Sequence, residues 1–295
     1  MAISSQGNSS RGKSSKGNVF ITGAASGIGA ATTRLLAHDG YTVFAGVHKE
    51  AGDLDLIPGV RQISIDVTDP ASVAEAARSV AAGTGTDGLV AVINNAGFIL
   101  QGPLELIHPE DLQRQFGVNT FGAAYVIAAF LPLLRAGHGR VINISAPTAR
   151  VPVPFLGPLA ASKAALASLS DALRLELAAW RIPVCVIEPG STDTQIFAKA
   201  EAAAQASLAA ADPALAGLYR DQLAAVAKAS SRQKLGPVEP IARTIATAVR
   251  ASKPKRRYTA GTGARLGSIL AAMPIGVRER AITAFLGLGK IKAGQ

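Results

Sequence analysis

The residues best placed to do chemistry are three glycines that directly follow the first apolar run of the chain. Gly23, Gly27 and Gly29 come after the run 19–21, with Ser26 and Ile28 between them, and a helix is predicted over 27–39. Glycines at such a turn let the backbone bend sharply and approach a pyrophosphate, whose charge then lies at the helix N-terminus. In a strand–turn–helix context this spacing predicts a dinucleotide-binding site.

The same spacing, G-x-x-x-G-x-G, is similar to that of the short-chain dehydrogenases/reductases, and further motifs extend the resemblance over about residues 18–262. The resemblance implies that Asp66 and Val67 contact the adenine and that Asn119 is a structural and catalytic asparagine. It implies that Lys163 holds the nicotinamide ribose. The remaining implied cofactor contacts form a turn after the fourth strand and a loop that grips the carboxamide: Asn95, Ala96 and Gly97, then Pro189, Gly190, Thr192 and Thr194.

Two positions depart from the family pattern. The family has a tyrosine four residues before the lysine and a serine thirteen before the tyrosine, but this chain has Leu159 and Ala146 there. A positioned acid contributes about 10²–10⁴-fold to a reaction rate. Loss of an oxyanion donor costs about 10²–10³-fold, and the two effects overlap. The usual proton donors are therefore missing.

Substitute donors are few. Ser162 lies one helical turn after Leu159 and is expected on the same helix face, and Tyr219 lies in an alanine-rich segment that is expected to cover the substrate. The hydroxyl of Ser145 is expected to point away from the site, because successive strand residues face opposite sides. A desolvated Lys163 would also be able to act as a base or to form an imine.

The cofactor preference depends on the end of the second strand. An acidic residue there would accept a hydrogen bond from the adenosine ribose and favour NAD, but the segment 46–49 has none. His48 or Lys49 would meet a 2′-phosphate electrostatically. We therefore favour NADP(H) over NAD(H).

The substrate side of the site is predicted to be apolar. Its expected lining is Phe155, Leu156, Leu159, Ile196 and Phe197, which favours a bulky hydrophobic ligand such as a lipid, steroid or polyketide. The stretch 257–261 resembles the subgroup that acts on retinoids, steroids and hydroxybutyrate. An edge strand followed by an interface helix would explain this stretch equally well.

Short apolar runs alternate with helix-length segments along the chain, which is typical of βαβ units and a parallel sheet. We predict a Rossmann-type, doubly wound α/β fold of about seven strands with helices on both faces. The predicted strands are 19–21, 41–47, 60–65, 89–93, 140–144, 183–187 and 257–259. The later predicted helices are one that opens at Asp69-Pro70, then 118–136 with Pro132 bending or ending it, 158–180, two in 195–235 broken near Asp212-Pro213, and 238–251.

The ends of the chain hold most of the net charge of +10. We predict a disordered tail at 1–17, the Rossmann-type domain at 18–262 with a substrate lid at about 195–235, and a helical extension at 263–295. This extension, basic and apolar, would lie on an anionic membrane surface, over the substrate mouth or at a subunit interface. The neutral body and the few aromatics argue against nucleic-acid binding.

The single cysteine and the four scattered histidines predict neither a disulfide framework nor a metal site. With no run of eighteen apolar residues and no secretory leader, we predict a cytoplasmic protein. We also predict that it forms a homodimer or homotetramer. Our main hypothesis is a divergent NADP(H)-dependent oxidoreductase that acts on a hydrophobic carbonyl or alcohol. The alternatives are a non-redox enzyme on this fold (a cyclase, isomerase or lyase) and a cofactor-binding protein without turnover.

Overall fold

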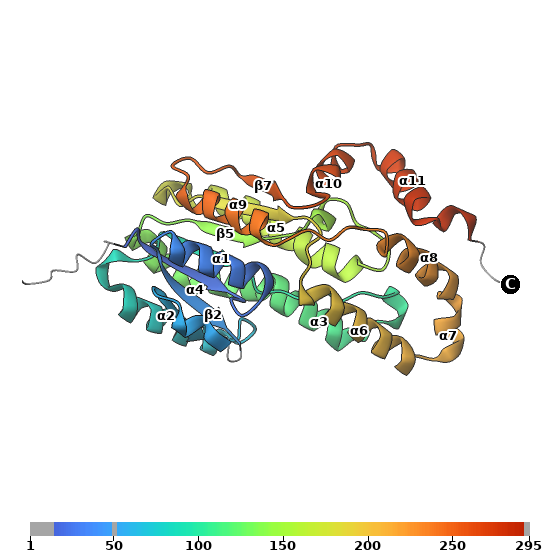
Figure 1. Cartoon of the computed structure of the whole chain (residues 1–295), viewed down its shortest axis with the longest axis horizontal. Helices are drawn as coiled ribbons and strands as arrows, with labels where there is room; N and C mark the ends of the chain where they lie inside the picture. The colour runs from blue at the N-terminus through green and yellow to red at the C-terminus, as the bar shows by residue number, and fades with distance from the viewer. Residues whose placement is uncertain (1–14, 49–51, 292–295) are drawn as a thin grey trace, which may run out of the picture.

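A computed structural model describes residues 15–48 and 52–291 of the chain. Its centre is one seven-stranded parallel sheet with the order β3-β2-β1-β4-β5-β6-β7 (Figure 1). The strands are β1 (Asn18–Thr22), β2 (Thr42–Val47), β3 (Val60–Ser64), β4 (Ala91–Asn94), β5 (Val141–Ile144), β6 (Val184–Pro189) and β7 (Arg257–Ala260). The order reverses between β1 and β4, so the carboxyl ends of these strands form the crevice where this class of sheet binds ligands. The predicted fold class is confirmed.

Helices cover both faces of the sheet. One face packs against α1 (Gly27–His38) and α9 (Glu239–Arg250), and the other against α2 (Pro70–Thr84), α4 (Ala123–Ala136) and α5 (Gly157–Glu176). Helix α2 begins as predicted, because the Asp69 carboxylate accepts hydrogen bonds from the amides of Ala71 and Ser72 and Pro70 is the first helical residue. Continuous Val and Ile in the strands thus fill two apolar layers.

The helix that precedes β5 is longer than predicted. It runs from α3 (Pro109–Phe116) through a π-helical segment, Gly117–Gly122, into α4, and it continues past Pro132 to Ala136. The prediction placed its start near residue 118, because Arg114 and Gln115 interrupt the apolar pattern. The helix is long and apolar enough to cross a membrane, yet Val126, Phe130 and Leu134 are fully buried in the domain core.

The lid consists of three helices where the sequence predicted two. These are α6 (Gln195–Ala210), α7 (Pro213–Leu218) and α8 (Arg220–Ser230). The break near Asp212-Pro213 is confirmed, since the Asp212 side chain accepts a hydrogen bond from the amide of Ala214. A second break at Tyr219 was not predicted, because the segment around it has the composition of a continuous helix.

The C-terminal extension forms α10 (Ala264–Ala271) and α11 (Ile275–Leu286). Figure 1 shows these helices and the lid gathered at one end of the molecule, on the right. At the other terminus, residues 1–14 of the predicted tail lie outside the described residues. Lys16 and Gly17 belong to the fold, because the Lys16 amide donates to the Gly40 carbonyl and the Gly17 carbonyl accepts from Thr42. The tail boundary at residue 17 is therefore wrong by at least two residues.

Candidate active site

The glycine turn after β1 forms a close-packed cradle. A Cβ atom on Gly29 would lie 2.1 Å from the Gly23 carbonyl oxygen, and Gly23 itself has a positive φ of 65°. Asn95 holds the turn from the neighbouring strand, because its side-chain amide donates to the carbonyls of Thr22 and Gly23, both at 3.0 Å. The Thr22 hydroxyl in turn accepts from the amides of Asn95 and Ala96. The backbone is thus bare of side chains where a pyrophosphate would approach.

Two observations show that this cradle fits a dinucleotide. The N-terminus of α1 has no side-chain cap, since Ser26 makes no capping hydrogen bond, so the first-turn amides are free to bind an anion. The hydroxyl of Thr194 is buried without a hydrogen-bond partner among the described residues. Its Cγ2 lies 3.2 Å from the Cβ position of Gly27. An unpartnered buried donor beside the phosphate turn is what a bound polar ligand would satisfy.

Asp66 and His48, which the sequence predicted to lie at the adenosine, contact each other after the ends of β3 and β2. The Asp66 carboxylate accepts hydrogen bonds from the hydroxyl and the amide of Thr68, and its other oxygen lies 3.4 Å from Nε2 of His48. The hydrogen bond from the Thr68 hydroxyl is the main cause that lowers the pKa of Asp66. Val67 packs on Gly122, where a Cβ would lie 2.8 Å from its side chain. His48 therefore lies at the expected position, while Lys49 lies outside the described residues.

Asn119 lies within the π-helical segment and not at a helix start. Its side chain exchanges two hydrogen bonds with the backbone of Phe98, and its amide also donates to the Ser162 hydroxyl at 3.3 Å. Gln115, which the sequence analysis missed, is fully buried and bonds the backbone of Phe98 and Leu100. These amides fix the segment after β4 beside the site, and a π-turn at such a position is common at functional sites.

Lys163 lies beside the turn at Gly97. A Cβ on Gly97 would lie 3.0 Å from Oδ1 of Asn119 and 3.4 Å from Nζ of Lys163. Lys163 is only 7% exposed as a residue, and its Nζ donates to the Ile144 carbonyl at 2.8 Å. Burial lowers the pKa of Lys163 to about 8. The structure thus brings the predicted Asn119, Gly97 and Lys163 together.

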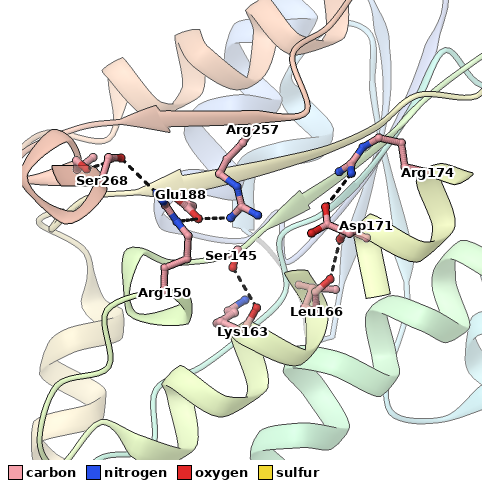
Figure 2. Close-up of polar contacts among 11 residues, drawn as sticks. Ser145, Arg150, Lys163, Leu166, Asp171, Arg174, Glu188, Arg257 and Ser268 are labelled. Atoms are coloured by element: carbon pink, nitrogen blue, oxygen red, sulfur yellow. Dashed lines mark hydrogen bonds and ion pairs between the residues drawn. The ribbon is translucent and has the colours of Figure 1, made fainter. Parts of the chain in front are cut away.

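Ala146 and Leu159, where the resemblance expects two hydroxyls, belong to the segments that Lys163 joins, since Lys163 follows Leu159 in α5 and its Nζ donates to Ile144 of β5. Ala146 ends the extended stretch after β5, and Leu159 lies in the first turn of α5. The Ser145 hydroxyl donates to the Lys163 carbonyl at 3.2 Å, so it does not replace the serine (Figure 2). Thr148, two residues after Ala146, has a buried hydroxyl without a partner among the described residues. The sequence analysis missed Thr148, because no spacing rule marks it.

Ser162 lies one turn after Leu159 in α5, and its hydroxyl is engaged within the protein. Its hydroxyl donates to the Leu159 carbonyl at 3.0 Å and accepts from Asn119, and the residue is fully buried. Two side chains three residues apart on a helix lie near each other but can have different neighbours. Here the Asn119 amide, on the neighbouring helix, donates a hydrogen bond to the Ser162 hydroxyl. Ser162 therefore links Asn119 to the first turn of α5 through its hydroxyl.

An apolar cluster covers Leu159 from the lid side. Leu159 packs with Ile99 and Ala200, and Leu156 and Ile196 lie against them. Phe197, which was also predicted to line this wall, is 37% exposed and lies outside the cluster. Ile99 and Ala200 were missed, because nothing in their local sequence distinguishes them from other core residues.

A polar clasp joins the lid to the loop after β4. The Tyr219 hydroxyl donates to the Glu105 carboxylate at 2.9 Å, and this hydrogen bond raises the pKa of Tyr219. The ring of Tyr219 meets Phe155 edge to face at 6.3 Å, and Phe155 adopts a φ of 64°. Tyr219 thus closes the lid over Phe155, and its hydroxyl is occupied by Glu105.

A buried charge cluster lies behind the loop that carries Ala146. Glu188 at the end of β6 has 0% side-chain exposure, and its carboxylate accepts from Arg150 at 3.0 and 2.6 Å and from Arg257 (Figure 2). Arg150 also donates to the Ser268 hydroxyl, and its carbonyl accepts from Arg278. The cluster therefore ties the C-terminal extension to the loop beside the site. Elsewhere among the described residues, no group of three or more potential metal ligands gathers.

Comparisons with known proteins agree with this architecture. Residues 17–205 match the family model described as short chain dehydrogenase. The chain is 34% identical over 281 residues to human 17-beta-hydroxysteroid dehydrogenase type 2, covering 88% of this chain and 71% of that protein. It is 33% identical over 249 residues to an NADPH-dependent 3-dehydrocapnine reductase of Ornithobacterium rhinotracheale, covering 81% and 86%.

A solved structure shows the same likeness. A short chain dehydrogenase from Burkholderia cenocepacia J2315 in complex with NADP superimposes with a TM-score of 0.70 at 28% identity, covering 92% of this chain and 98% of that one. The chain belongs to the short-chain dehydrogenase family. As a member of that family it is an NAD(P)-dependent oxidoreductase.

Proposed function

We propose that this protein is an NADP(H)-dependent oxidoreductase that acts on a hydrophobic carbonyl or alcohol by an atypical site without the usual tyrosine and serine. The observation that carries the proposal is the cradle at Gly23, Gly29 and Thr194. Gly23 packs on the turn after β4, whose Gly97 lies next to Nζ of Lys163. A buried hydroxyl without a partner costs free energy, and a bound cofactor would give the Thr194 hydroxyl that partner.

The residues fit the cofactor in three places. The α1 N-terminus and Thr194 would bind the pyrophosphate and carboxamide side, Lys163 the nicotinamide ribose, and Asp66 with Val67 the adenine. When bound, the nicotinamide supplies or accepts a hydride. The protein's own groups then orient the substrate, exclude water with the lid and manage the proton.

NADP(H) is favoured over NAD(H) because no carboxylate ends β2, where one would repel a 2′-phosphate. His48 lies at that position, although it also contacts Asp66. A relative described as NADPH-dependent and a similar structure that contains NADP support the preference. We expect NADPH to bind more tightly than NADH in fluorescence titrations. In His48→Ala, the ratio of the two dissociation constants should be smaller than in wild type.

A hydrophobic substrate is favoured by the apolar cluster around Leu159 (Ile99, Leu156, Ile196 and Ala200). A bulky apolar ligand that displaced lid side chains from this cluster would replace one set of apolar contacts with another. The steroid dehydrogenase among the relatives is consistent with such a ligand.

The direct test is single-turnover hydride transfer from NADPH deuterated at the nicotinamide C4 to a panel of hydrophobic ketones. Deuterium in the product alcohol supports the proposal. The double variant Leu159→Tyr with Ala146→Ser should accelerate the transfer, because it restores both donors. No transfer in wild type or in the double variant would refute the proposal.

A second function is favoured by Ala146 and Leu159 themselves. Without either hydroxyl, the apolar cluster around Leu159 is also suited to a non-redox reaction of an apolar substrate, such as a cyclisation, isomerisation or elimination. That function gives product without oxidation of NADPH. Stoichiometric oxidation of the cofactor would exclude it.

We also propose a homodimer or homotetramer, because Phe121 and Tyr125 expose aromatic surface on the long helix. Light scattering of wild type and of Phe121→Glu tests this assembly. A wild-type monomer would contradict it.

A further inference from the structure

We propose that Lys163 is the proton donor of this site, so that its ammonium group takes over the task of the tyrosine that Leu159 replaces. This inference rests on the proposed function, since it concerns the proton that a reduced carbonyl must receive. It goes beyond the ribose-binding role that the resemblance gives to Lys163.

The hydroxyl and amide donors around Lys163 are engaged elsewhere. The Ser145 hydroxyl donates to the Lys163 carbonyl, and the Ser162 hydroxyl to the Leu159 carbonyl. Tyr219 donates to Glu105, whose carboxylate raises the pKa of the phenol and makes it a weaker acid. The Asn119 amide donates to Phe98 and Ser162. Each of these groups would have to break a protein hydrogen bond before it met a substrate.

Two buried hydroxyls of the site, those of Thr148 and Thr194, have no partner among the described residues, and Thr194 lies at the glycine turn against Gly27. An alkyl hydroxyl does not ionise near neutral pH, so it can donate a hydrogen bond or relay a proton but cannot be the source of one. Thr148 is therefore compatible with stabilising an oxyanion, and it leaves the need for an acid unmet.

Lys163 meets that need by geometry. Its ammonium has three N–H groups, and one of them donates to the Ile144 carbonyl. The other two remain for ligands, and Nζ lies next to Gly97 at the carboxyl edge of β4 and β5. Burial lowers its pKa to about 8, so the group is charged at neutral pH and yet releases its proton readily.

No carboxylate of residues 15–48 or 52–291 forms an ion pair with Lys163. The elements packed against α5 contribute few charged groups. The pKa of Lys163 is lowered because burial removes its ammonium from water. Glu188 of β6 is bound by Arg150 and Arg257. The remaining charged side chains on these elements are on the surface of α3 and on α5 itself: Glu110, Asp111, Arg114, Asp171, Arg174 and Glu176.

The proposed step balances as follows. The carbonyl carbon receives a hydride, with its electron pair, from a reduced nicotinamide, and the carbonyl π electrons move to the oxygen. A Lys163 N–H bond breaks and an O–H bond forms to that oxygen, directly or across one water molecule. The neutral amine then takes a proton from solvent. In the oxidation direction the neutral amine accepts the alcohol proton.

The test compares wild type with Lys163→Arg, which keeps a positive donor for the ribose but cannot release a proton near neutral pH. NADPH binding, followed by fluorescence, should change by less than about tenfold, which also shows that the variant is folded. Single-turnover transfer should slow by about 10²–10⁴-fold. Lys253→Arg, an exposed lysine before β7, is the matched control and should behave as wild type in both measurements.

The pH profile gives a second, independent readout. Above the pKa of Lys163 in the complex, the wild-type rate of ketone reduction should fall about tenfold per pH unit, because each unit removes nine-tenths of the charged donor. ¹⁵N NMR of labelled Lys163 with NADPH bound should give the same pKa. Lys163→Arg should have no such fall, and Leu159→Tyr should replace it with the titration of a phenol.

If Lys163→Arg fails to bind NADPH, Lys163→Cys treated with bromoethylamine restores an ammonium of lower pKa at the same place. The one native cysteine, Cys185, should resist the reagent, because it is buried and burial raises its thiol pKa to about 11. The rate should recover with a pH profile shifted downward. An unshifted profile contradicts the proposal.

The possible outcomes separate this inference from the proposed function. Transfer that is independent of pH, or equally fast in Lys163→Arg, refutes the donor role and leaves the oxidoreductase intact. Loss of transfer in Thr148→Val together with a flat wild-type profile would assign the proton to a relay through Thr148. No transfer in wild type at any pH refutes both the donor role and the proposed function.

Discussion

Replacement of Glu188 by glutamine should destabilise the protein far more than the same replacement on the surface. Glu188 is fully buried and holds two guanidinium groups, of Arg150 and Arg257, whose side chains are 32% and 29% exposed. Breaking a buried ion pair by removing one partner typically costs about 3–5 kcal/mol. Because both arginines reach water, we expect a loss nearer about 2–4 kcal/mol in the free energy of unfolding.

The measurement is urea and thermal unfolding of Glu188→Gln against Glu75→Gln. Glu75 also pairs with an arginine, Arg78, but both side chains are about two-thirds exposed, and such pairs contribute about 0.2–1 kcal/mol. For a chain of this size, Glu188→Gln should lower Tm by roughly 5–15 °C. A double-mutant cycle with Arg150→Met should show strong coupling, because both residues belong to one cluster.

The same variant should loosen the C-terminal extension, since Arg150 joins Ser268 and Arg278 to the loop beside Ala146. Limited proteolysis should therefore cut near α10 earlier in Glu188→Gln than in Glu75→Gln. If the two variants lose equal stability, the reasoning that burial makes this cluster costly to break is wrong.

Three further predictions follow from the site. Gly29→Ala should weaken NADPH binding by more than about tenfold, because its Cβ would overlap the Gly23 carbonyl oxygen at 2.1 Å; Gly276→Ala, with no atom within 4 Å, should bind normally, and equal titration curves would contradict the cradle. The unfolding free energy of wild type should rise relative to Lys163→Met between pH 8 and about 10.5, by at most about 3 kcal/mol, because the folded pKa lies below the ordinary value and the unfolded chain keeps that proton longer; parallel stability curves would show that Lys163 is not desolvated. Tyr219→Phe should lose its hydrogen bond to Glu105 and speed proteolysis between α7 and α8, and unchanged cleavage would show that the clasp does not hold the lid.

Much of the site could be predicted from sequence because its residues follow directly from the ends of strands. In a parallel sheet, the carboxyl ends of the strands lie at one edge, so Gly23 after β1 and Asn95 after β4 had to come together once these neighbouring strands were recognised. The expectation that Leu159 and Ala146 stand where the family has a tyrosine and a serine comes from the resemblance together with the spacing to Lys163. These inferences depend on local pattern and chain order.

The sequence could not show which donors near Lys163 are already engaged. Ser162 has the spacing of a substitute for Leu159, but Asn119 on another helix captures its hydroxyl. Gln115 looks like the polar face of a helix and is in fact buried, because it satisfies the backbone around Phe98. Side-chain hydrogen bonds between distant segments have no signature in local periodicity.

The sequence by itself therefore determined that this chain forms a Rossmann-type sheet, and it predicts a dinucleotide at the glycine turn and the absence of the two usual hydroxyls. Only the tertiary structure decided which side chains surround Leu159, Ala146 and Lys163. It buried Lys163 without an ion pair to any carboxylate of the described part of the chain, and it engaged the hydroxyls of Ser145 and Ser162 elsewhere. It also joined Arg150 and Arg257 to Glu188 behind the loop. The physical reason is that desolvation and hydrogen-bond competition depend on which segments pack together, whereas strand and turn formation depend mainly on neighbouring residues.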